Sequence, residues 1–218
     1  MELILGYIHA ISLEKEQYDF FSRFSLVLFI KRVLDIVTAI TALLLCSWLF
    51  LIIAVLVKIS SKGNIIYRQE RVGLNGKLFT MFKFRTMYSN AELNGPKLSQ
   101  PNDKRITLIG KLLRNYHLDE LPQFINVLRG DMSVVGTRPE RQYYIEQIMQ
   151  KAPEYRYILK HKPGITSIGQ IKFGYAKNVD EMIERLQYDL NYVQHFSLLK
   201  DLKILLKTIG FILLKIKA

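Results

Sequence analysis

One stretch of the sequence is long and apolar enough to enter a lipid bilayer. It runs from Ile36 to Val57, 22 residues without a charge (IVTAITALLLCSWLFLIIAVLV). As a helix it would measure about 33 Å, and a hydrocarbon core is about 30 Å thick. A signal peptide is a poor interpretation, because the run is too long, starts too late and precedes no small-residue cleavage site. We favour a membrane helix over a buried core helix, because the chain offers no comparably apolar partner segment.

Cations flank this run on both sides. Lys31 and Arg32 precede it, and Lys58 and Lys62 follow it. Basic residues favour the cytoplasmic side of a membrane, so each end by itself would be placed in the cytoplasm. We therefore predict a re-entrant helix, which enters the lipid and returns to the same face. A helix that spans the bilayer is the alternative.

A re-entrant helix must break inside the membrane, and the backbone groups freed at the break need partners. Ser47 lies at the midpoint of the run, where its hydroxyl is expected to bond a carbonyl one turn back. Asp35 lies at the membrane entrance, where a carboxylate is costly unless it is paired. Lys31 and Arg32 are within one helical turn of Asp35, so the sequence predicts that Asp35 pairs with them.

A second membrane signal lies at the C-terminus, in residues 198–218. Lys200, Lys203 and Lys207 share one face of a helix, and leucine and isoleucine residues fill the others. This pattern predicts an interfacial amphipathic helix whose cationic side contacts lipid phosphates. A surface helix packed on its own domain is the alternative. At the other end, residues 1–30 finish in an apolar stretch, 20–30, which is interpreted as another interfacial segment.

The charge balance points to an anionic partner. Lys plus Arg number 31 and Asp plus Glu 19, a formal net charge of +12. Nucleic acid, a membrane surface and a phosphorylated substrate all fit this excess. Nucleic acid alone is disfavoured, because the mean hydropathy is positive, +0.11, and no recognition motif is present. The single cysteine, Cys46, excludes a disulfide framework and a cysteine-rich zinc module.

Residues 63–197 are predicted to form a soluble α+β domain that is dominated by helices. Residues 65–84 alternate partly around Asn75-Gly76, which predicts a small β-hairpin. Helical patterns follow at 106–116, 119–129, 141–149 and 179–192, with a polar loop at 88–104. The predicted organisation is an N-terminal interfacial segment (1–30), a re-entrant membrane helix (31–62), a catalytic domain (63–197) and a membrane-associated helix (198–218).

Asp119 and Glu120 are the sharpest candidates for chemistry. Pro122 is tolerated only in the first turn of the helix that ends at Gly130, so Asp119 is expected near the N-cap and Glu120 just inside. One interpretation is ordinary capping. The other is functional, because a helix N-terminus favours a phosphate and keeps a carboxylate ionised, available as a nucleophile or a metal ligand.

Two anions that meet in such a site need cations. Arg85, Arg114 and Arg138 lie near the acid pair in sequence and are the predicted phosphate-binding residues. Pro139 fixes the backbone directly after Arg138, although a solvated arginine in a turn is an equal alternative. Mg²⁺ held by Asp119 and Glu120 would complete the neutralisation. No Asp-x-Asp pair, GxGxxG, Walker A, HExxH or GxSxG motif is present.

Several motifs then follow one another in a recognisable order. They are KRVLD, the apolar run, YRQERVGLNGKLFTMFKFRTM, HLDELPQFINVLRGDMSVVGTRPE, HKPGIT, YDLNYV and DLKIL. Over about residues 31–207 the chain resembles the bacterial sugar transferases, the monotopic phosphoglycosyl transferases that begin glycan assembly on a polyprenyl phosphate. The short N-terminus looks like the minimal form of that family, without the multi-span region of larger members.

The resemblance implies a specific reaction. Such enzymes use Mg²⁺ and transfer a sugar-1-phosphate from a UDP-sugar to undecaprenyl phosphate, with release of UMP. Asp119 would be the nucleophile that holds a covalent phosphosugar, and Glu120 would assist with the metal or a proton. Arg138 would be the arginine of the family's Pro-Arg-Pro motif, which here reads Thr137-Arg138-Pro139. The catalytic domain would lie on the cytoplasmic face of the bacterial inner membrane.

The chain departs from the family pattern at two places. Ser47-Trp48 stands where the family has the Ser-Pro pair that breaks the re-entrant helix. Ser167-Ile168 stands where the family often has Gly-Trp, a difference that bears on the identity of the donor sugar. The rival interpretation is a basic membrane-bound adaptor without catalysis, and nucleic-acid binding is a third. The sequence leaves the sugar, the glycan pathway and the oligomeric state open.

Overall fold

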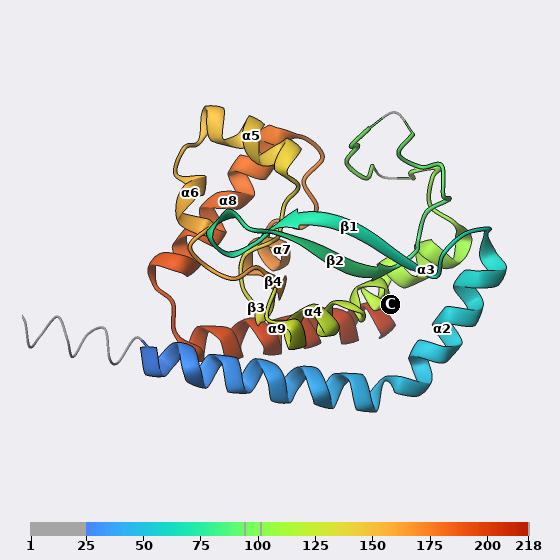
Figure 1. Cartoon of the computed structure of the whole chain (residues 1–218), viewed down its shortest axis with the longest axis horizontal. Helices are drawn as coiled ribbons and strands as arrows, with labels where there is room; N and C mark the ends of the chain where they lie inside the picture. The colour runs from blue at the N-terminus through green and yellow to red at the C-terminus, as the bar shows by residue number, and fades with distance from the viewer. Residues whose placement is uncertain (1–24, 94, 101, 218) are drawn as a thin grey trace, which may run out of the picture.

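The structure, a computed structural model, describes residues 25–217 apart from residues 94 and 101. It describes side chains as far as residue 212. The part of the predicted N-terminal interfacial segment that precedes residue 25 lies outside the described residues. From residue 25 onward, a bent pair of helices lies along the lower edge of the molecule and rises at one side (Figure 1).

The bent pair consists of Ser25–Leu45 and α2 (Ser47–Ser60), and the two helices meet at an angle of 63°. Within the described residues, no unbroken helix has both the length and the hydropathy for a membrane span. The two halves of the bent pair meet that test only together. This geometry agrees with the bend that the re-entrant prediction requires. Whether the pair enters a membrane stays a prediction.

The break falls at Cys46, and the predicted role of Ser47 there is wrong. The Ser47 side chain is exposed and makes no hydrogen bond within the described part of the chain. Backbone groups form the hydrogen bonds at the break instead. The Cys46 N–H donates to the Ala42 carbonyl at 2.9 Å, and the Phe50 N–H donates to the Cys46 carbonyl at 3.0 Å. The bend therefore leaves few backbone groups without partners, and no side chain has to replace them.

One side of the bent pair is apolar and exposed. Fourteen of its large apolar side chains are at least 42% exposed, namely Leu26, Leu28, Phe29, Val33, Leu34, Val37, Ile40, Leu44, Leu45, Trp48, Leu51, Ile52, Val55 and Ile59. The opposite side packs on the domain through Ala39, Ile53 and Val57, which are 2% exposed or less. A continuous exposed apolar surface of this extent is typical of a membrane or protein contact.

Two small two-stranded sheets form the β part of the fold. β1 (Ile66–Val72) pairs antiparallel with β2 (Leu78–Phe84) around the turn Leu74–Gly76, which confirms the predicted hairpin. β3 (Ser133–Val135) pairs parallel with β4 (Gly164–Thr166). The sequence analysis did not predict this second sheet, because strands of three residues are too short to show a period of two.

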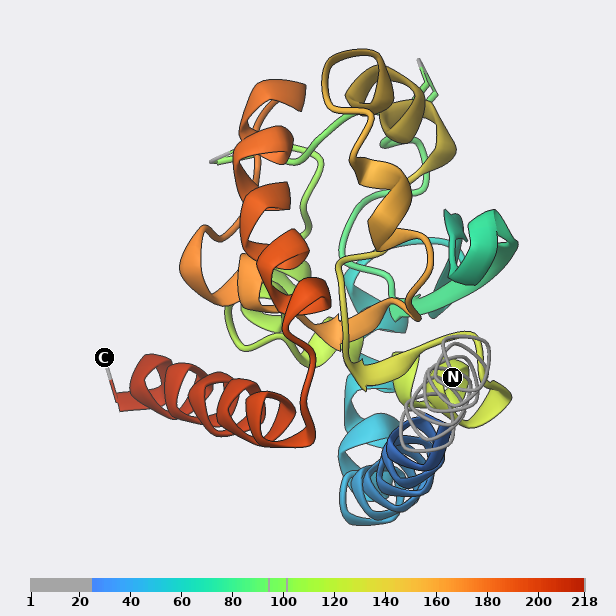
Figure 2. The same cartoon turned by 90° about the vertical axis from the view of Figure 1, so that its left-hand side faces the viewer.

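The remaining helices surround these sheets. They are α3 (Leu108–Asn115), α4 (Gln123–Arg129), α5 (Gln142–Lys151), α6 (Tyr155–Ile158), α7 (Ile168–Lys172), α8 (Val179–Gln194) and α9 (Leu198–Lys217). α5, α6 and α8 share a core that includes Ile145, Ile148 and Leu186. These three helices lie on the side of the molecule away from the bent pair (Figure 2). The fold is therefore α+β and helix-dominated, as predicted.

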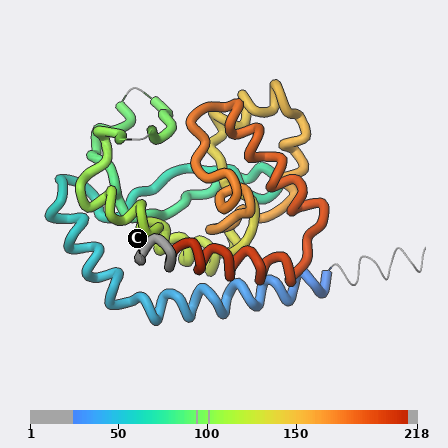
Figure 3. The backbone as a smooth tube through the Cα atoms, turned by 180° about the vertical axis from the view of Figure 1, so that it is seen from behind, coloured from blue at the N-terminus to red at the C-terminus, as the bar shows by residue number. Residues whose placement is uncertain are grey.

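α9 lies on the same side of the molecule as the bent pair (Figure 3). Its inner face packs on the domain through buried Ile204 and through Asp201, which accepts a hydrogen bond from Tyr192 at 2.6 Å. Its outer face exposes Leu199, Leu202, Leu206 and Ile209. The helix is thus packed on its own domain, as the alternative interpretation held, and still presents an apolar face beside the bent pair. Its contact with lipid stays a prediction.

Candidate active site

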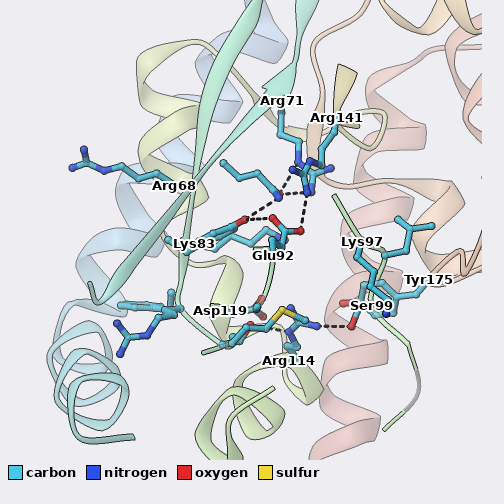
Figure 4. A pocket seen from close by; sticks show the side chains of 18 of the residues that line it. Arg68, Arg71, Lys83, Glu92, Lys97, Ser99, Arg114, Asp119, Arg141 and Tyr175 are labelled. Carbon is cyan, nitrogen blue, oxygen red and sulfur yellow. Dashed lines mark hydrogen bonds and ion pairs between the residues drawn. The ribbon is translucent and has the colours of Figure 1, made fainter. Parts of the chain in front are cut away.

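A cavity of about 730 Å³ opens between the hairpin, the segment that follows β2 and the turn that follows β3. Its lining is strongly cationic. Only three carboxylates face nine basic side chains; the acids are Glu92, Asp119 and Glu140, and the bases are Arg68, Arg71, Lys83, Arg85, Lys97, Arg114, Arg138, Arg141 and Arg185. Figure 4 shows Asp119 and Arg114 at one end and Arg71, Arg141 and Glu92 at the other. An elongated anion fits such a site.

Asp119 and Glu120 lie in a short 3₁₀ turn, Leu118–Glu120, and not in the first turn of a helix. α4 begins only at Gln123, with Pro122 at its N-cap, so the predicted capping position is wrong. His117 precedes the turn in the left-handed region, with φ at 56°. Both carboxylates are nevertheless only 6% exposed. Their burial comes from the tertiary packing of the turn against β2 and α3.

Glu120 forms an ion pair with Lys83 of β2, with 2.5 Å between Nζ and Oε1. Burial acts to raise the pKa of Glu120, but the positive charges of Lys83 and Arg138 outweigh it and lower that pKa to about 2. Glu120 is therefore ionised at neutral pH. Lys83 is not among the predicted site residues, because the two cations of KFRTM at the end of the hairpin are a weak signal alone.

Asp119 lines the cavity and has no ion pair with any described residue. Burial raises its pKa to about 6; Lys83 acts to lower that pKa, and the neighbouring Glu120 charge raises it further. The two adjacent acids thus have opposite shifts, one held as a carboxylate and one poised near neutrality. Such a split is typical of catalytic acid pairs.

Asn126 of α4 fixes the strand that carries Lys83. Its Oδ1 accepts from the Phe82 N–H at 3.0 Å, and its Nδ2 donates to the Thr80 carbonyl at 2.7 Å. This amide therefore bonds two backbone groups on one edge of β2, directly before Lys83. Because Asn126 is fully buried, the spacing between β2 and the Leu118–Glu120 turn is rigidly defined.

Arg138 reaches the cavity from the turn after β3. The turn passes so close to β4 that a Cβ on Gly136 would lie 2.5 Å from the Lys162 carbonyl oxygen, which only glycine allows. The Arg138 guanidinium lies over the Tyr175 ring, 5.7 Å from its centroid, and its Nε lies 3.7 Å from Glu140. Its positive charge lowers the pKa of Glu120, so Arg138 lies between Glu140 and the acid pair. Its phosphate-binding role stays a prediction.

Arg114 also lines the cavity near Asp119. Its Nε donates to the Thr86 hydroxyl at 2.8 Å, and its Nη1 donates to the Ser99 hydroxyl at 2.8 Å. Both hydrogen-bond partners are neutral, and the charge of Arg114 acts on the nearby Asp119, whose pKa it lowers. Its position therefore agrees with the predicted phosphate-binding role, which no contact in the structure tests.

Arg85 lines the cavity, but its guanidinium is already bonded to the protein. Its guanidinium donates to three backbone carbonyls at and beyond the end of α2, those of Val57 (3.0 Å), Ser61 (2.6 Å) and Asn64. Val57 lies in the last turn of α2, Ser61 is its C-cap residue, and Asn64 follows in the chain that leads to β1. Arg85 therefore closes the end of α2 and is not free to bind a phosphate in this arrangement.

The charged residues before the apolar run, Lys31, Arg32 and Asp35, also have partners other than those predicted. Asp35 does not pair with Arg32. Its carboxylate accepts from Ser133 and Val134 of β3, each at 2.9 Å. Arg32 donates to two carbonyls of α4, and Lys31 forms an ion pair with Asp201 of α9 at 2.6 Å. All three therefore join the first helix to the domain.

The far end of the cavity is a network that sequence reasoning missed. Buried Glu140 accepts from Arg185 at 2.5 Å and from Arg71 at 3.4 Å. Arg141 pairs with Glu92 at 2.8 Å. Glu140 directly follows Pro139, so its proximity to Arg138 in sequence was the one available signal.

No group of three His, Cys, Asp or Glu residues that would hold a metal ion occurs within residues 25–217 without 94 and 101. A metal held by one or two carboxylates and completed by substrate phosphates is still compatible with the site, and Mg²⁺ prefers this arrangement. Asp119 lines the cavity without an ion-pair partner, so the residues present fit such an ion. Chemically, the site combines a buried carboxylate with a cationic wall, as displacement at a phosphorus atom requires.

Comparisons with known proteins agree on one family. The model of the bacterial sugar transferase family matches residues 26–215. The chain is 42% identical to a UDP-N-acetylgalactosamine-undecaprenyl-phosphate N-acetylgalactosaminephosphotransferase of Aeromonas hydrophila, over 85% of this chain and 44% of that protein. It is 40% identical to a UDP-glucose:undecaprenyl-phosphate glucose-1-phosphate transferase of Caulobacter vibrioides, over 84% of this chain and 69% of that protein.

A third relative has no sugar in its name. The exopolysaccharide production protein ExoY of Rhizobium meliloti is 39% identical, over 82% of this chain and 83% of that protein. The matched lengths differ widely among these relatives, and the chain spans less than half of the Aeromonas protein. The names of the Aeromonas and Caulobacter proteins contain two different sugars, so similarity alone does not identify the donor.

Proposed function

Because the chain belongs to the bacterial sugar transferase family, we propose that it transfers a sugar-1-phosphate from a UDP-sugar to undecaprenyl phosphate and releases UMP. The reaction would be the first membrane step in the assembly of a glycan such as an exopolysaccharide, a capsule, an O-antigen or a glycoprotein glycan. The observation that carries the proposal is the buried Asp119 carboxylate at one end of a cationic cavity of about 730 Å³. A basic adaptor without catalysis would not need a buried acid pair.

The chemistry divides into two displacements at one phosphorus atom. In the first, a carboxylate oxygen of Asp119 attacks the phosphorus that carries the sugar, and the bond between that phosphorus and the bridging oxygen breaks. UMP leaves with the electron pair. In the second, an oxygen of undecaprenyl phosphate attacks the same phosphorus, and the Asp119 carboxylate is regenerated. Atoms, charges and electrons balance without an external oxidant or reductant.

The other residues of the site would supply positive charge to the phosphates and hold the acids in position. Lys83 holds Glu120, and Arg114 and Arg138 offer positive charge beside Asp119. These cations would bind the diphosphate of the donor and stabilise the charge on the leaving UMP. Asp119 and Glu120 would hold Mg²⁺, which supplies further charge neutralisation when it is bound.

The location follows from the substrates and the helices. A UDP-sugar is a cytoplasmic metabolite, and undecaprenyl phosphate is a lipid of the bacterial inner membrane. We therefore place the catalytic domain on the cytoplasmic face of that membrane, with the bent pair as a re-entrant anchor. The bend of 63° and the exposed apolar face support this placement.

A screen for UMP release tests the function. Purified enzyme would be incubated with undecaprenyl phosphate and each of a set of UDP-sugars. We expect one or a few donors to release UMP and to yield a lipid-linked sugar diphosphate. Reactions without undecaprenyl phosphate control for simple hydrolysis. Absence of UMP release with every donor, from enzyme shown to be folded, would favour the adaptor.

Cysteine labelling tests the topology. On a Cys46→Ser background, single cysteines at Ser12 and Ser61 would be probed in intact cells with a membrane-impermeant maleimide. A re-entrant pair places both positions in the cytoplasm, so we expect no labelling until the cells are opened. Labelling of position 12 alone in intact cells would show a spanning helix. A known periplasmic cysteine in the same cells serves as the positive control.

A further inference from the structure

The first helix sends charged side chains into the domain, on the face opposite its exposed apolar side. Arg32 and Asp35 lie about one helical turn apart and contact two different parts of the domain. Asp35 is only 6% exposed, so its carboxylate depends on the partners that it finds there. Each of these contacts leads directly to one half of the candidate active site.

Asp35 is bound to the strand that carries Arg138. Its Oδ1 accepts from the Ser133 hydroxyl and from the Val134 N–H, each at 2.9 Å, and Ser133 is fully buried. β3 ends at Val135, and the chain reaches Arg138 within three further residues. The backbone at Gly136 packs so closely against the chain around Lys162 and Gly164 that this segment has little room to move. A shift of β3 would therefore be transmitted to the Arg138 guanidinium.

Arg32 is bound to the helix that follows the acid pair. Its Nη1 donates to the Val127 carbonyl at 2.6 Å, and its Nη2 donates to the Leu128 carbonyl at 3.0 Å. These carbonyls belong to the last turn of α4, where a cation is favourable. α4 is a rigid element of seven residues that begins three residues after Glu120. Its far end therefore fixes the orientation of the Leu118–Glu120 turn.

We propose that Asp35 and Arg32 are positioning residues, through which the first helix sets the placement of Asp119 relative to Arg138. The helix would then be a part of the active-site framework as well as an anchor. The proposal rests on the proposed transfer reaction. A displacement of about 1 Å in such a site costs up to about 100-fold in rate, so small shifts are sufficient.

Two substitutions at Asp35 distinguish the proposed positioning of Arg138 from an effect of the Asp35 negative charge in the membrane. Asp35→Leu and Asp35→Asn both remove the charge. Only asparagine keeps an oxygen that accepts from Ser133 and Val134. We expect Asp35→Leu to lower kcat at least 10-fold and to raise the KM for the donor, because Arg138 moves. Asp35→Asn is expected to stay within about 3-fold of the wild type.

Controls exclude loss of folding or insertion. Val37 is 56% exposed on the apolar side, so Val37→Asn adds a polar group to that side without touching the domain. Turnover is measured per membrane-bound, folded enzyme, and we expect this variant to match the wild type. If Asp35→Leu does not fold, Ser133→Ala removes only the hydroxyl donor. It is then expected to raise the donor KM at least 3-fold.

Hydrogen exchange gives a readout without turnover. We expect the amides of residues 136–138 to exchange faster in Asp35→Leu than in the wild type, and those of α8 to be unchanged. Equal loss in Asp35→Asn and Asp35→Leu would assign the effect to charge and overturn the proposal. Wild-type kinetics in Asp35→Leu would also overturn the proposal. A fall in Vmax with an unchanged KM for the donor and unchanged hydrogen exchange would overturn it too. UMP release by the wild type tests the transfer reaction separately.

Discussion

Asp119→Asn is expected to abolish UMP release, to less than about a hundredth of the wild-type rate. The substitution preserves the shape of the side chain, but an amide has no anionic oxygen to attack phosphorus. Mass spectrometry should find a phosphosugar on Asp119 of the wild-type enzyme and none at position 119 of the variant. Turnover above that threshold in the purified variant would exclude covalent catalysis by this residue.

The same variant is expected to be more stable than the wild type. Burial raises the pKa of Asp119 to about 6, above the value in the unfolded chain, so the ionised form opposes folding at higher pH. The cost is absent below about pH 4 and complete above about pH 6. Asparagine removes it, which should stabilise the fold by about 2 kcal/mol at pH 7.5 and raise the Tm by roughly 5 °C. Thermal unfolding at pH 7.5 measures this.

The pH dependence of the wild-type enzyme follows from the same group. Because the carboxylate is the attacking form, turnover should rise with pH and reach half its maximum near pH 6. Glu120, whose pKa is lowered by Lys83 and Arg138, remains ionised over this range and adds no second step there. A rate independent of pH between 5 and 8 would contradict the assignment of Asp119.

Removal of Mg²⁺ is the second change expected to have a large effect. The donor diphosphate and the Asp119 carboxylate repel one another, and the described residues offer too few acids to form a complete metal cage without phosphate ligands. We expect EDTA to abolish turnover and an excess of Mg²⁺ to restore it. Full activity in EDTA would remove the metal from the mechanism.

A binding measurement makes the metal test sharper. Wild type and Asp119→Asn would be titrated with UDP in the presence of Mg²⁺ or EDTA. If the ion bridges the carboxylate and the phosphates, Mg²⁺ should tighten binding of UDP to the wild type more than to the variant. An equal effect on both proteins would place the ion on the nucleotide alone, without a role for Asp119 as ligand.

Local sequence patterns were sufficient to predict the hairpin and most helices. The hairpin has the turn dipeptide Asn75-Gly76 between alternating strands, and α8 begins and ends within two residues of the prediction. Gly130 ends α4 with φ at 89°, as its position after an apolar pattern predicted. These features depend on residues close together in the chain, so a single sequence contains them.

The sequence alone indicated the two acids of the candidate site, but it did not indicate which cations contact them. Asp119 and Glu120 are adjacent, and adjacent acids beside a turn are visible without a fold. Lys83 lies in β2 and Arg85 directly follows that strand, yet Arg85 closes α2 and Lys83 binds Glu120. The direction of a long side chain is decided by partners 24 to 37 residues away, which local patterns do not contain.

The predicted contacts of the first helix were wrong for a related reason. Arg32 and Asp35 are spaced for a local ion pair, and an exposed helix would form one. Burial changes the outcome, because the domain offers two carbonyls in the last turn of α4 to Arg32 and two donors at β3 to Asp35. A donor or acceptor that lies inside the fold has to be satisfied there.

The ion pair between Lys31 and Asp201 joins positions 170 residues apart. A ribosome that adds about 5 to 20 residues per second needs roughly 10 to 30 s to cover that separation. During this time the apolar run has left the ribosome, but the partner of Lys31 has not been synthesised. The lysine must then wait in water or among lipid headgroups. The contact between Lys31 and Asp201 therefore forms only after nearly the whole chain has been synthesised, which makes docking of the first helix a late event in folding.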